Sequence, residues 1–192
     1  MLVTDLIGQI QLEMTDDEAI RLYWLVESIG KISGDLVEVG VYKGGSAKII
    51  CEAKGEGELH LFDTFEGLPE VDPSIDGGMT KGSYKAELEQ VQKNLADYKN
   101  VHFYKGLFQA VVWNIDGFSD KRFCLVHLDV DLYVTTVECL LFFYPRMARG
   151  GVILSHDYPN TPGIRKAFDD YFEIKPEPIL RIAENQCLVV KQ

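Results

Sequence analysis

Hydrophobic residues follow two different periods along this chain. Between Thr15 and Ile32 they recur mostly three or four positions apart, which is typical of one face of a helix. Thr15 with Glu18 matches the capping-box pattern that begins such a helix, and Ser33 with Gly34 ends it. A short apolar run at 35–40 then predicts a buried strand that leads into a glycine-containing turn.

The same alternation continues along most of the chain. We expect further strands at 58–63, 101–105, 122–129 and 151–155. We expect helices at 45–54, 85–97, 108–114, 134–148 and 163–172. Strands that alternate with helices indicate a mostly parallel sheet with helices on both faces, which is an α/β fold.

The end of the chain departs from this alternation. Two extended runs at 178–183 and 186–191, joined by Glu184 and Asn185, predict an antiparallel hairpin. No stretch is long enough to be a linker, so we expect one domain over 1–192, with 1–32 as a helical segment packed on it. The loop at 68–82 is rich in Gly, Pro and Asp and is expected to be the most mobile segment.

Composition excludes several classes of partner. The chain has 192 residues with 19 Lys and Arg against 30 Asp and Glu, so its formal charge is 19 minus 30, or -11. Binding to nucleic acid or to an anionic membrane surface requires a basic face, which is absent from this sequence. The longest apolar runs, at 123–125 and 139–144, are much shorter than the roughly 20 residues of a membrane span.

The cysteines and the first residues point to the cytoplasm. Cys51, Cys124, Cys139 and Cys187 are widely separated and have no paired metal-ligand spacing, so we interpret them as reduced core thiols. The first residues, MLVTD, lack a basic segment followed by an apolar one, so export is not expected.

Candidate binding residues follow the first two strands, because ligands of open parallel sheets lie beyond the carboxyl ends of the strands. After the first strand, Gly40 and Gly44 would let the backbone approach a ligand closely. After the second, Asp63 could accept the two hydroxyls of a ribose. The alternative is that Glu38 and Asp63 are solvated strand ends and that the glycines only form a turn.

Two segments that contain these residues, VEVGVYKGGSA and LHLFDTFEGLP, resemble S-adenosylmethionine-dependent methyltransferases of the seven-strand class. With FYKGLF, HLDVDLYVTT, YPRMARGGVILSHDY and PGIRKAFDDY, the chain resembles the macrocin O-methyltransferase group more narrowly. The resemblance implies a single Rossmann-like sheet of seven strands, mostly parallel with an antiparallel C-terminal hairpin. It also implies methyl transfer from S-adenosylmethionine to a hydroxyl of a sugar, glycoside or related polyol.

The resemblance assigns a cofactor-binding set. Glu38, Gly40 and Gly44 match the motif beside the amino-acid part of the cofactor, Asp63 matches the ribose acid, and Gly106 lies in the loop near adenine. Ser46 either caps the helix after the turn or contacts the cofactor carboxylate. The complete predicted set is Glu38, Gly40, Tyr42, Gly44, Ser46, Asp63, Thr64, Gly106 and Asp129.

A second group of polar residues follows the fourth and fifth strands. Asp129 and Asp131 end one strand, and His156 and Asp157 end the next, so neighbouring parallel strands place these side chains together. Oxygen-rich clusters of this kind suit a divalent cation, chiefly Mg²⁺. A hydroxyl chelated there would be more acidic, and a carboxylate beside it could take the proton.

The family's usual metal ligands match Asp129, His156 and Asp157, but the family normally has Asp at the second position. Imidazole is a poorer ligand for Mg²⁺ and a better one for Mn²⁺, Fe²⁺, Co²⁺ or Zn²⁺. Three interpretations follow: a changed metal preference, a histidine base beside two carboxylates, or a site without metal. We retain a divalent ion, Mg²⁺ or Mn²⁺, as the expectation. The catalytic candidates are Asp129, Asp131 and His156.

Other polar residues near these strands have two interpretations each. Asp131 is either the general base or the cap of the helix expected from Val134. Arg165 either binds a substrate oxygen or pairs with Asp169 one helical turn on. His127 lies inside an apolar strand and is expected to be a buried, partnered histidine rather than a ligand.

The function expected is metal-assisted O-methylation of a small hydroxylated acceptor. One alternative is a cofactor-binding module with impaired catalysis, which the change at His156 would explain. Another is a metal-dependent hydroxylase-like relative on the same fold. Only about 14 residues precede the first expected helix, so we expect the acceptor pocket to be open or to be completed by a neighbouring subunit in a homo-oligomer.

Overall fold

A central seven-stranded sheet organises the computed structural model, which describes residues 3–8 and 10–192. Its strands are β1 (Asp35–Val39), β2 (Leu59–Asp63), β3 (Val101–Lys105), β4 (Phe123–Leu128), β5 (Met147–His156), β6 (Leu180–Arg181) and β7 (Gln186–Val190). They lie in the order β3-β2-β1-β4-β5-β7-β6. β1 to β5 are parallel, and β7 runs antiparallel to β5 and β6. The predicted mostly parallel sheet with a terminal antiparallel hairpin is confirmed.

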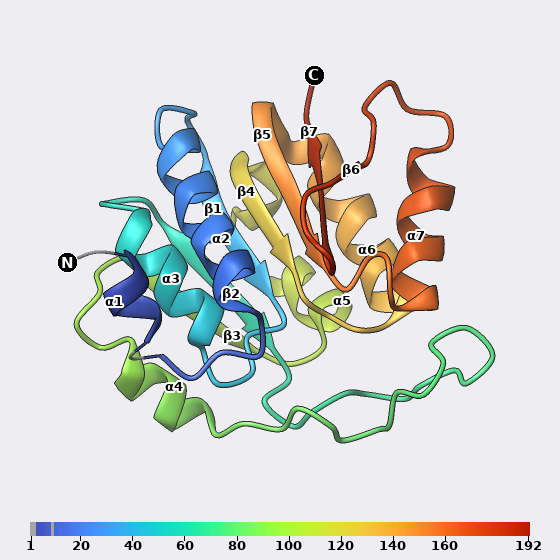
Figure 1. Ribbon diagram of the computed structural model, residues 1–192, viewed down its shortest axis with the longest axis horizontal. Coiled ribbons are helices and arrows are strands. Elements are labelled where there is room, and N and C mark those ends of the chain that lie inside the picture. Colours follow the sequence, from blue (N-terminus) through green and yellow to red (C-terminus); the bar gives the residue numbers. More distant parts are fainter. Residues whose placement is uncertain (1–2, 9) are drawn as a thin grey trace.

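Helices cover both faces of this sheet (Figure 1). They are α1 (Val3–Ile7), α2 (Asp16–Ile29), α3 (Gly45–Ala53), α4 (Leu88–Asn94), α5 (Phe108–Val111), α6 (Tyr133–Phe143) and α7 (Pro162–Phe172). α2 and α3 pack on the face formed by Leu36, Leu61 and Leu125. α5, α6 and α7 pack on the opposite face, where Phe62, Phe123 and Val126 lie. Because both faces are covered, β1, β2 and β4 are buried along almost their whole length rather than on one face only.

The order in which the chain adds strands to the sheet changes direction between β1 and β4. The chain proceeds from β1 outward through β2 to β3, then returns to pair β4 with the other edge of β1. At such a reversal the connections leave on opposite sides and open a crevice at the carboxyl ends of the two strands. In Figure 1 the arrows of β1, β4 and β5 point downward, and the loop between β2 and α4 runs below their tips toward α7.

Some predicted boundaries are wrong, in part because of prolines. The helix expected at 134–148 ends at Phe143, because Pro145 lacks a backbone N–H; a 3₁₀ turn follows and β5 begins at Met147. The helix expected at 85–97 covers only Leu88–Asn94, and the structure offers no single reason for its shorter bounds. β6 has two residues rather than six, and Pro178 has no N–H for the ladder.

Other expectations are confirmed. Thr15 and Glu18 form the complete capping box at the start of α2. The four cysteines are buried and unpaired. No helix among the residues described is long and apolar enough to cross a membrane.

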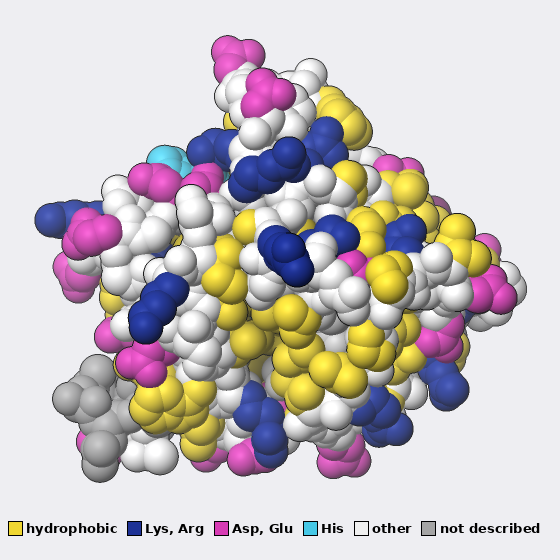
Figure 2. Space-filling view, turned by 90° about the horizontal axis from the view of Figure 1, so that it is seen from above, with side chains coloured by type: hydrophobic (Ala, Val, Ile, Leu, Met, Phe, Trp, Pro, Cys, Tyr) yellow, Lys and Arg dark blue, Asp and Glu magenta, His cyan; other side chains and the backbone are white. Residues whose placement is uncertain are grey.

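Figure 2 shows the end of the molecule opposite the strand tips, where Lys and Arg side chains are dispersed among acidic and apolar ones.

A buried carboxylate attaches the end of the chain to the domain. Glu177, between α7 and β6, accepts hydrogen bonds from the Tyr144 hydroxyl at 2.7 Å and the Lys191 Nζ at 2.9 Å. Burial opposes the charged form, but these bonds and that from the Gln192 N–H outweigh it and lower the pKa of Glu177 to about 2. The charged form therefore stabilises the fold above the ordinary glutamate pKa, and this contribution disappears as the pH falls toward 2.

We predict that Glu177→Gln lowers the free energy of unfolding at pH 7 by about 1–3 kcal/mol, because a charged hydrogen-bond acceptor is lost. The difference from wild type should shrink as the pH falls from 5 to 3. Denaturant titrations at several pH values measure this, with the exposed neighbour Glu173→Gln as the control. Equal stability of wild type and Glu177→Gln at pH 7 would contradict the prediction.

Candidate functional site

A cavity opens at the carboxyl ends of the parallel strands, beside the reversal between β1 and β4. Seven residues of the predicted cofactor set line it: Gly40, Tyr42, Ser46, Asp63, Thr64, Gly106 and Asp129. His156, Asp157 and Asp131 line it too. The structure therefore brings the turn after β1 and the polar cluster after β4 and β5 to one cavity.

Gly40 fixes the distance between the tips of β1 and β4. Its φ is +87°, and a Cβ there would lie 1.9 Å from the carbonyl oxygen of Asp129. The Gly40 N–H donates to Phe62 at 2.9 Å, and the Asp129 N–H donates to Val39 at 2.9 Å. Gly40 thus permits the backbone of β1 to contact that of Asp129. Gly40 also lines the cavity, and its contact with a ligand stays a prediction.

Asp63 holds the turn that follows β1. Its Oδ2 accepts the N–H groups of Val41 and Tyr42 at 2.7 and 2.8 Å, and its Oδ1 accepts that of Phe65 at 2.6 Å. Since the carboxylate also lines the cavity, it can shape the turn and face a ligand at the same time.

Two members of the predicted cofactor set lie behind the cavity wall. Glu38 is fully buried, and its Oε1 lies 2.8 Å from Nδ1 of His127. This contact confirms His127 as a buried, partnered histidine. Gly44 is the left-handed residue before α3, and a Cβ there would lie 2.9 Å from Val91. Both residues support the turn without reaching the cavity, which leaves their cofactor contact a prediction.

Ser46 does not cap α3, because Gly44 precedes that helix and no side chain caps it. Ser46 is instead a buried residue that lines the cavity. Of the two roles expected for Ser46, helix capping is therefore wrong, and contact with the cofactor carboxylate remains a prediction.

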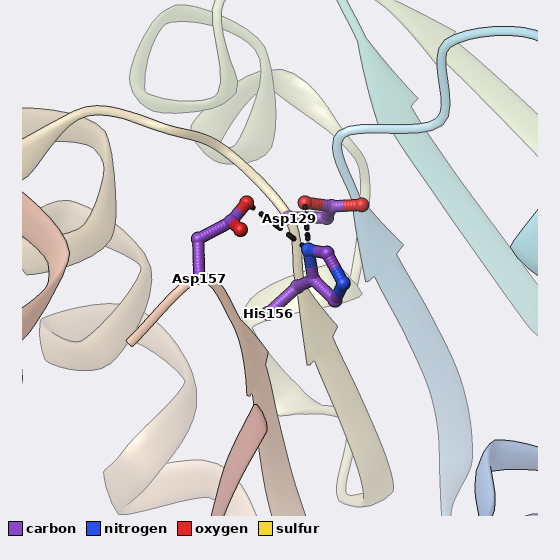
Figure 3. Close-up of side chains that lie close together, drawn as sticks. All are labelled: Asp129, His156 and Asp157. Carbon is purple, nitrogen blue, oxygen red and sulfur yellow. Dashed lines mark hydrogen bonds and ion pairs between the residues drawn. The ribbon is translucent and has the colours of Figure 1, made fainter. Parts of the chain in front are cut away.

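His156 lies between two carboxylates (Figure 3). Its Nδ1 is 3.0 Å from Oδ2 of Asp157 and 3.4 Å from Oδ1 of Asp129. Burial disfavours the imidazolium, but the hydrogen bonds and charges of both carboxylates outweigh it and raise the pKa of His156 to about 11. Burial would likewise raise the pKa of Asp129, yet His156 holds it below its ordinary value.

Asp131 is placed in the cavity by a strained turn. Its φ is +61°, a left-handed conformation that is uncommon outside glycine. Burial, together with the charges of Asp129 and Asp157, raises the pKa of Asp131 to about 8. α6 begins after Leu132 without a side-chain cap from its own segment, so the interpretation of Asp131 as a helix cap is wrong.

Asp76 supplies the hydrogen bond that Asp131 was expected to make. Its Oδ1 accepts the N–H of Tyr133, the first residue of α6, at 2.7 Å, and the residue is only 4% exposed. Asp76 belongs to the loop expected to be mobile, which is also closed at its base where Leu68 exchanges hydrogen bonds with Gly82 and Ser83. Sequence analysis missed Asp76 because nothing local indicates which helix a loop carboxylate will contact.

Arg165 lies outside the cavity. Its Nε is 3.5 Å from Oδ2 of Asp169, and both side chains are largely exposed. The surface ion pair, rather than the substrate contact, is confirmed for this residue.

The donor atoms of Asp129, His156 and Asp157 fit a divalent cation. One ligand atom from each lies within 4.8 Å of the others. Two ligands at right angles on an ion with bonds of about 2.1 Å are about 3 Å apart, close to the separations at His156 Nδ1. With one imidazole beside two carboxylates, the donor set suits Mn²⁺, Fe²⁺, Co²⁺ or Zn²⁺ better than Mg²⁺.

Known proteins share this sequence pattern and this fold. The family model for Macrocin-O-methyltransferase (TylF) matches residues 13–188. The chain is 32% identical over 169 residues to the 8-demethyl-8-(2,3-dimethoxy-alpha-L-rhamnosyl)-tetracenomycin-C 4'-O-methyltransferase of Streptomyces olivaceus, which covers 79% of this chain and 63% of that protein. It is 28% identical over 158 residues to the Mycinamicin III 3''-O-methyltransferase of Micromonospora griseorubida, with 73% and 61% covered. The chain thus spans less than two thirds of the length of these relatives.

Solved structures share the fold. The O-methyltransferase NovP superposes with a TM-score of 0.76 at 21% identity, over 92% of this chain and 80% of that one. TomG, an O-methyltransferase from Streptomyces achromogenes solved with SAM, superposes with a TM-score of 0.65 at 13% identity, over 99% and 86%.

We predict that Asp76→Ala destabilises the domain by about 1 kcal/mol, because α6 loses its N-terminal hydrogen-bond acceptor. The loop at 68–82 should then become sensitive to limited proteolysis, while Asp72→Ala, an exposed carboxylate of the same loop, should change much less. Denaturant unfolding and a timed protease digest measure the two effects. Unchanged stability and unchanged cleavage would show that the contact between Asp76 and Tyr133 does not hold the loop.

Proposed function

Because the chain belongs to the macrocin O-methyltransferase (TylF) family, we propose that it transfers the methyl group of S-adenosylmethionine to a hydroxyl of a sugar or glycoside. The observation that carries this proposal is the shared cavity: the turn at Gly40 and the cluster at Asp129, His156 and Asp157 line the same space. The relative from Streptomyces olivaceus, whose name describes 4'-O-methylation of a rhamnosyl compound, supports the acceptor class.

The cofactor half of the proposal rests on the turn after β1 and the tip of β2. Asp63 holds the Val41 and Tyr42 amides and faces the cavity, which suits the two hydroxyls of a ribose. Thr64 and Gly106 line the same side. TomG was solved in complex with SAM, which supports this type of donor on this fold.

The acceptor half rests on the polar cluster. A divalent ion held by Asp129, His156 and Asp157 would make a chelated hydroxyl more acidic. The imidazole at this position favours Mn²⁺ over Mg²⁺. The chain's own residues would align the acceptor oxygen with the methyl group of the donor and exclude water from it.

Asp131 is the carboxylate that we assign to proton transfer. It lines the cavity beside Asp129 and Asp157 and is free of the capping contact with α6. A carboxylate oxygen of Asp131 would take the hydroxyl proton as the acceptor oxygen forms its bond to the methyl carbon. The carbon–sulfur bond breaks in the same step, so that S-adenosylhomocysteine and the methyl ether are the products.

The direct test is turnover. Purified protein is mixed with S-adenosylmethionine, Mn²⁺ or Mg²⁺, and panels of glycosides, nucleotide sugars and catechols, and S-adenosylhomocysteine is quantified. Methylated glycosides or nucleotide sugars support the proposal. Cofactor binding without turnover of any acceptor would indicate a binding module with impaired catalysis, and absence of cofactor binding would contradict the proposal.

Asp63→Ala is predicted to weaken S-adenosylmethionine binding at least tenfold. The N–H groups of Val41 and Tyr42 lose their acceptor, and the ribose hydroxyls of the cofactor lose the carboxylate that we assign to them. Isothermal titration calorimetry measures the dissociation constant. Glu66→Gln provides a matched control, since Glu66 is an exposed carboxylate three residues away. If both variants weakened S-adenosylmethionine binding equally, Asp63 would not be the carboxylate that binds the ribose.

Asp129→Ala is predicted to abolish turnover and to weaken Mn²⁺ binding, while S-adenosylmethionine binding stays within a few-fold of wild type. Its carboxylate faces His156, whereas Asp63 holds the turn at the cofactor side. Calorimetry with cofactor and with Mn²⁺ separates the two effects. Methyl transfer that persists in Asp129→Ala would show that the cluster is not catalytic.

A further inference from the structure

We propose that Glu18 is a positioning residue of this site, which orients His156 and thereby selects Mn²⁺ over Mg²⁺. This inference rests on the metal-binding part of the proposed function. Glu18 lies in the first turn of α2, far in sequence from β5, and its carboxylate reaches the side of His156 that faces away from Asp129 and Asp157.

The Glu18 carboxylate is buried and held on both oxygens. Its side chain is 3% exposed. Oε2 accepts hydrogen bonds from the Thr15 N–H at 3.0 Å and the Thr15 hydroxyl at 2.8 Å, and Oε1 accepts the Asn185 N–H at 3.3 Å. The capping box of α2 and the turn of the β6–β7 hairpin thus fix the position of one negative charge inside the domain.

The two nitrogens of His156 face different groups. Nδ1 points to Asp157 and Asp129, the other members of the candidate metal cluster. Nε2 is buried and has no hydrogen-bond partner among the residues that the structure describes, and Oε2 of Glu18 lies 3.7 Å from it. A carboxylate behind one nitrogen favours the proton there and leaves the lone pair of the other nitrogen for a ligand, as in carboxylate–histidine–metal arrangements.

The strand beside His156 is also polar at this level. Gln186 of β7 pairs with His156 in the sheet and is fully buried. Within residues 3–8 and 10–192, neither side-chain amide atom of Gln186 has a hydrogen-bond partner. The strand pairing therefore places a second buried polar residue beside His156. A buried polar group without a partner in a native protein calls for an explanation, such as a catalytic role or a bound water or ion.

The orientation of His156 should matter for Mn²⁺ much more than for Mg²⁺. Mg²⁺ binds carboxylates and keeps its waters, so Asp129 and Asp157 supply most of its affinity. Mn²⁺ gains more from an imidazole ligand. Loss of the carboxylate at Glu18 should therefore weaken Mn²⁺ binding more than Mg²⁺ binding. General loosening of the fold would weaken both.

The test compares Glu18→Gln with wild type and with Asp17→Asn. Glutamine also completes capping boxes, so the start of α2 is retained. Asp17 is the adjacent acid in the same turn, is exposed and pairs with Arg21, so its variant controls for loss of one negative charge. Mn²⁺ affinity is measured from the electron paramagnetic resonance signal of the free ion, Mg²⁺ affinity by competition, and folding by thermal unfolding.

We expect Glu18→Gln to bind Mn²⁺ about 10- to 100-fold more weakly, with Mg²⁺ affinity and melting temperature close to wild type. Asp17→Asn should match wild type for both ions. Unchanged Mn²⁺ affinity in Glu18→Gln would overturn the proposal, and so would an equal loss for both ions. Wild type that binds no Mn²⁺ would overturn it together with the metal assignment, whereas methyl transfer is decided separately by turnover.

Discussion

The contact between the backbones of Gly40 and Asp129 is the constraint on which this site depends. A side chain at Gly40 would overlap the Asp129 carbonyl, so only glycine lets the tips of β1 and β4 lie this close. The strand ladder then places the turn after β1 beside the residues after β4 and β5. Without that approach, the cavity and the carboxylate cluster would be two separate surfaces rather than one.

Local patterns were sufficient to predict the architecture. Apolar runs such as Phe123–Leu128 are recognisable because a strand buried on both faces has no polar alternation. The capping box at Thr15 and Glu18 is also a local signal. The apolar pattern predicts a longer α6 because it continues past Phe143, whereas Pro145 ends the helix in the structure.

Only part of the site could be predicted from the sequence. The residues that were missed contact partners far away along the chain. Residues at strand ends, such as Asp63, Asp129 and His156, come together because of topology, which the alternation of strands and helices predicts. Asp76 and Glu18 act on α6 and on His156 across 57 and 138 positions of sequence, and no local signal carries such contacts. The contact of Glu18 with His156 was not predicted, because the capping box at the start of α2 already accounts for a glutamate at this position.

A crystal structure with S-adenosylhomocysteine and Mn²⁺, recorded near the manganese absorption edge, is the most direct measurement of the central claim. The account predicts the cofactor in the cavity beside Gly40 and an anomalous peak bound by Asp129, His156 and Asp157, on the side of the cofactor sulfur. Cofactor density elsewhere, or manganese that binds away from these three side chains, would contradict it.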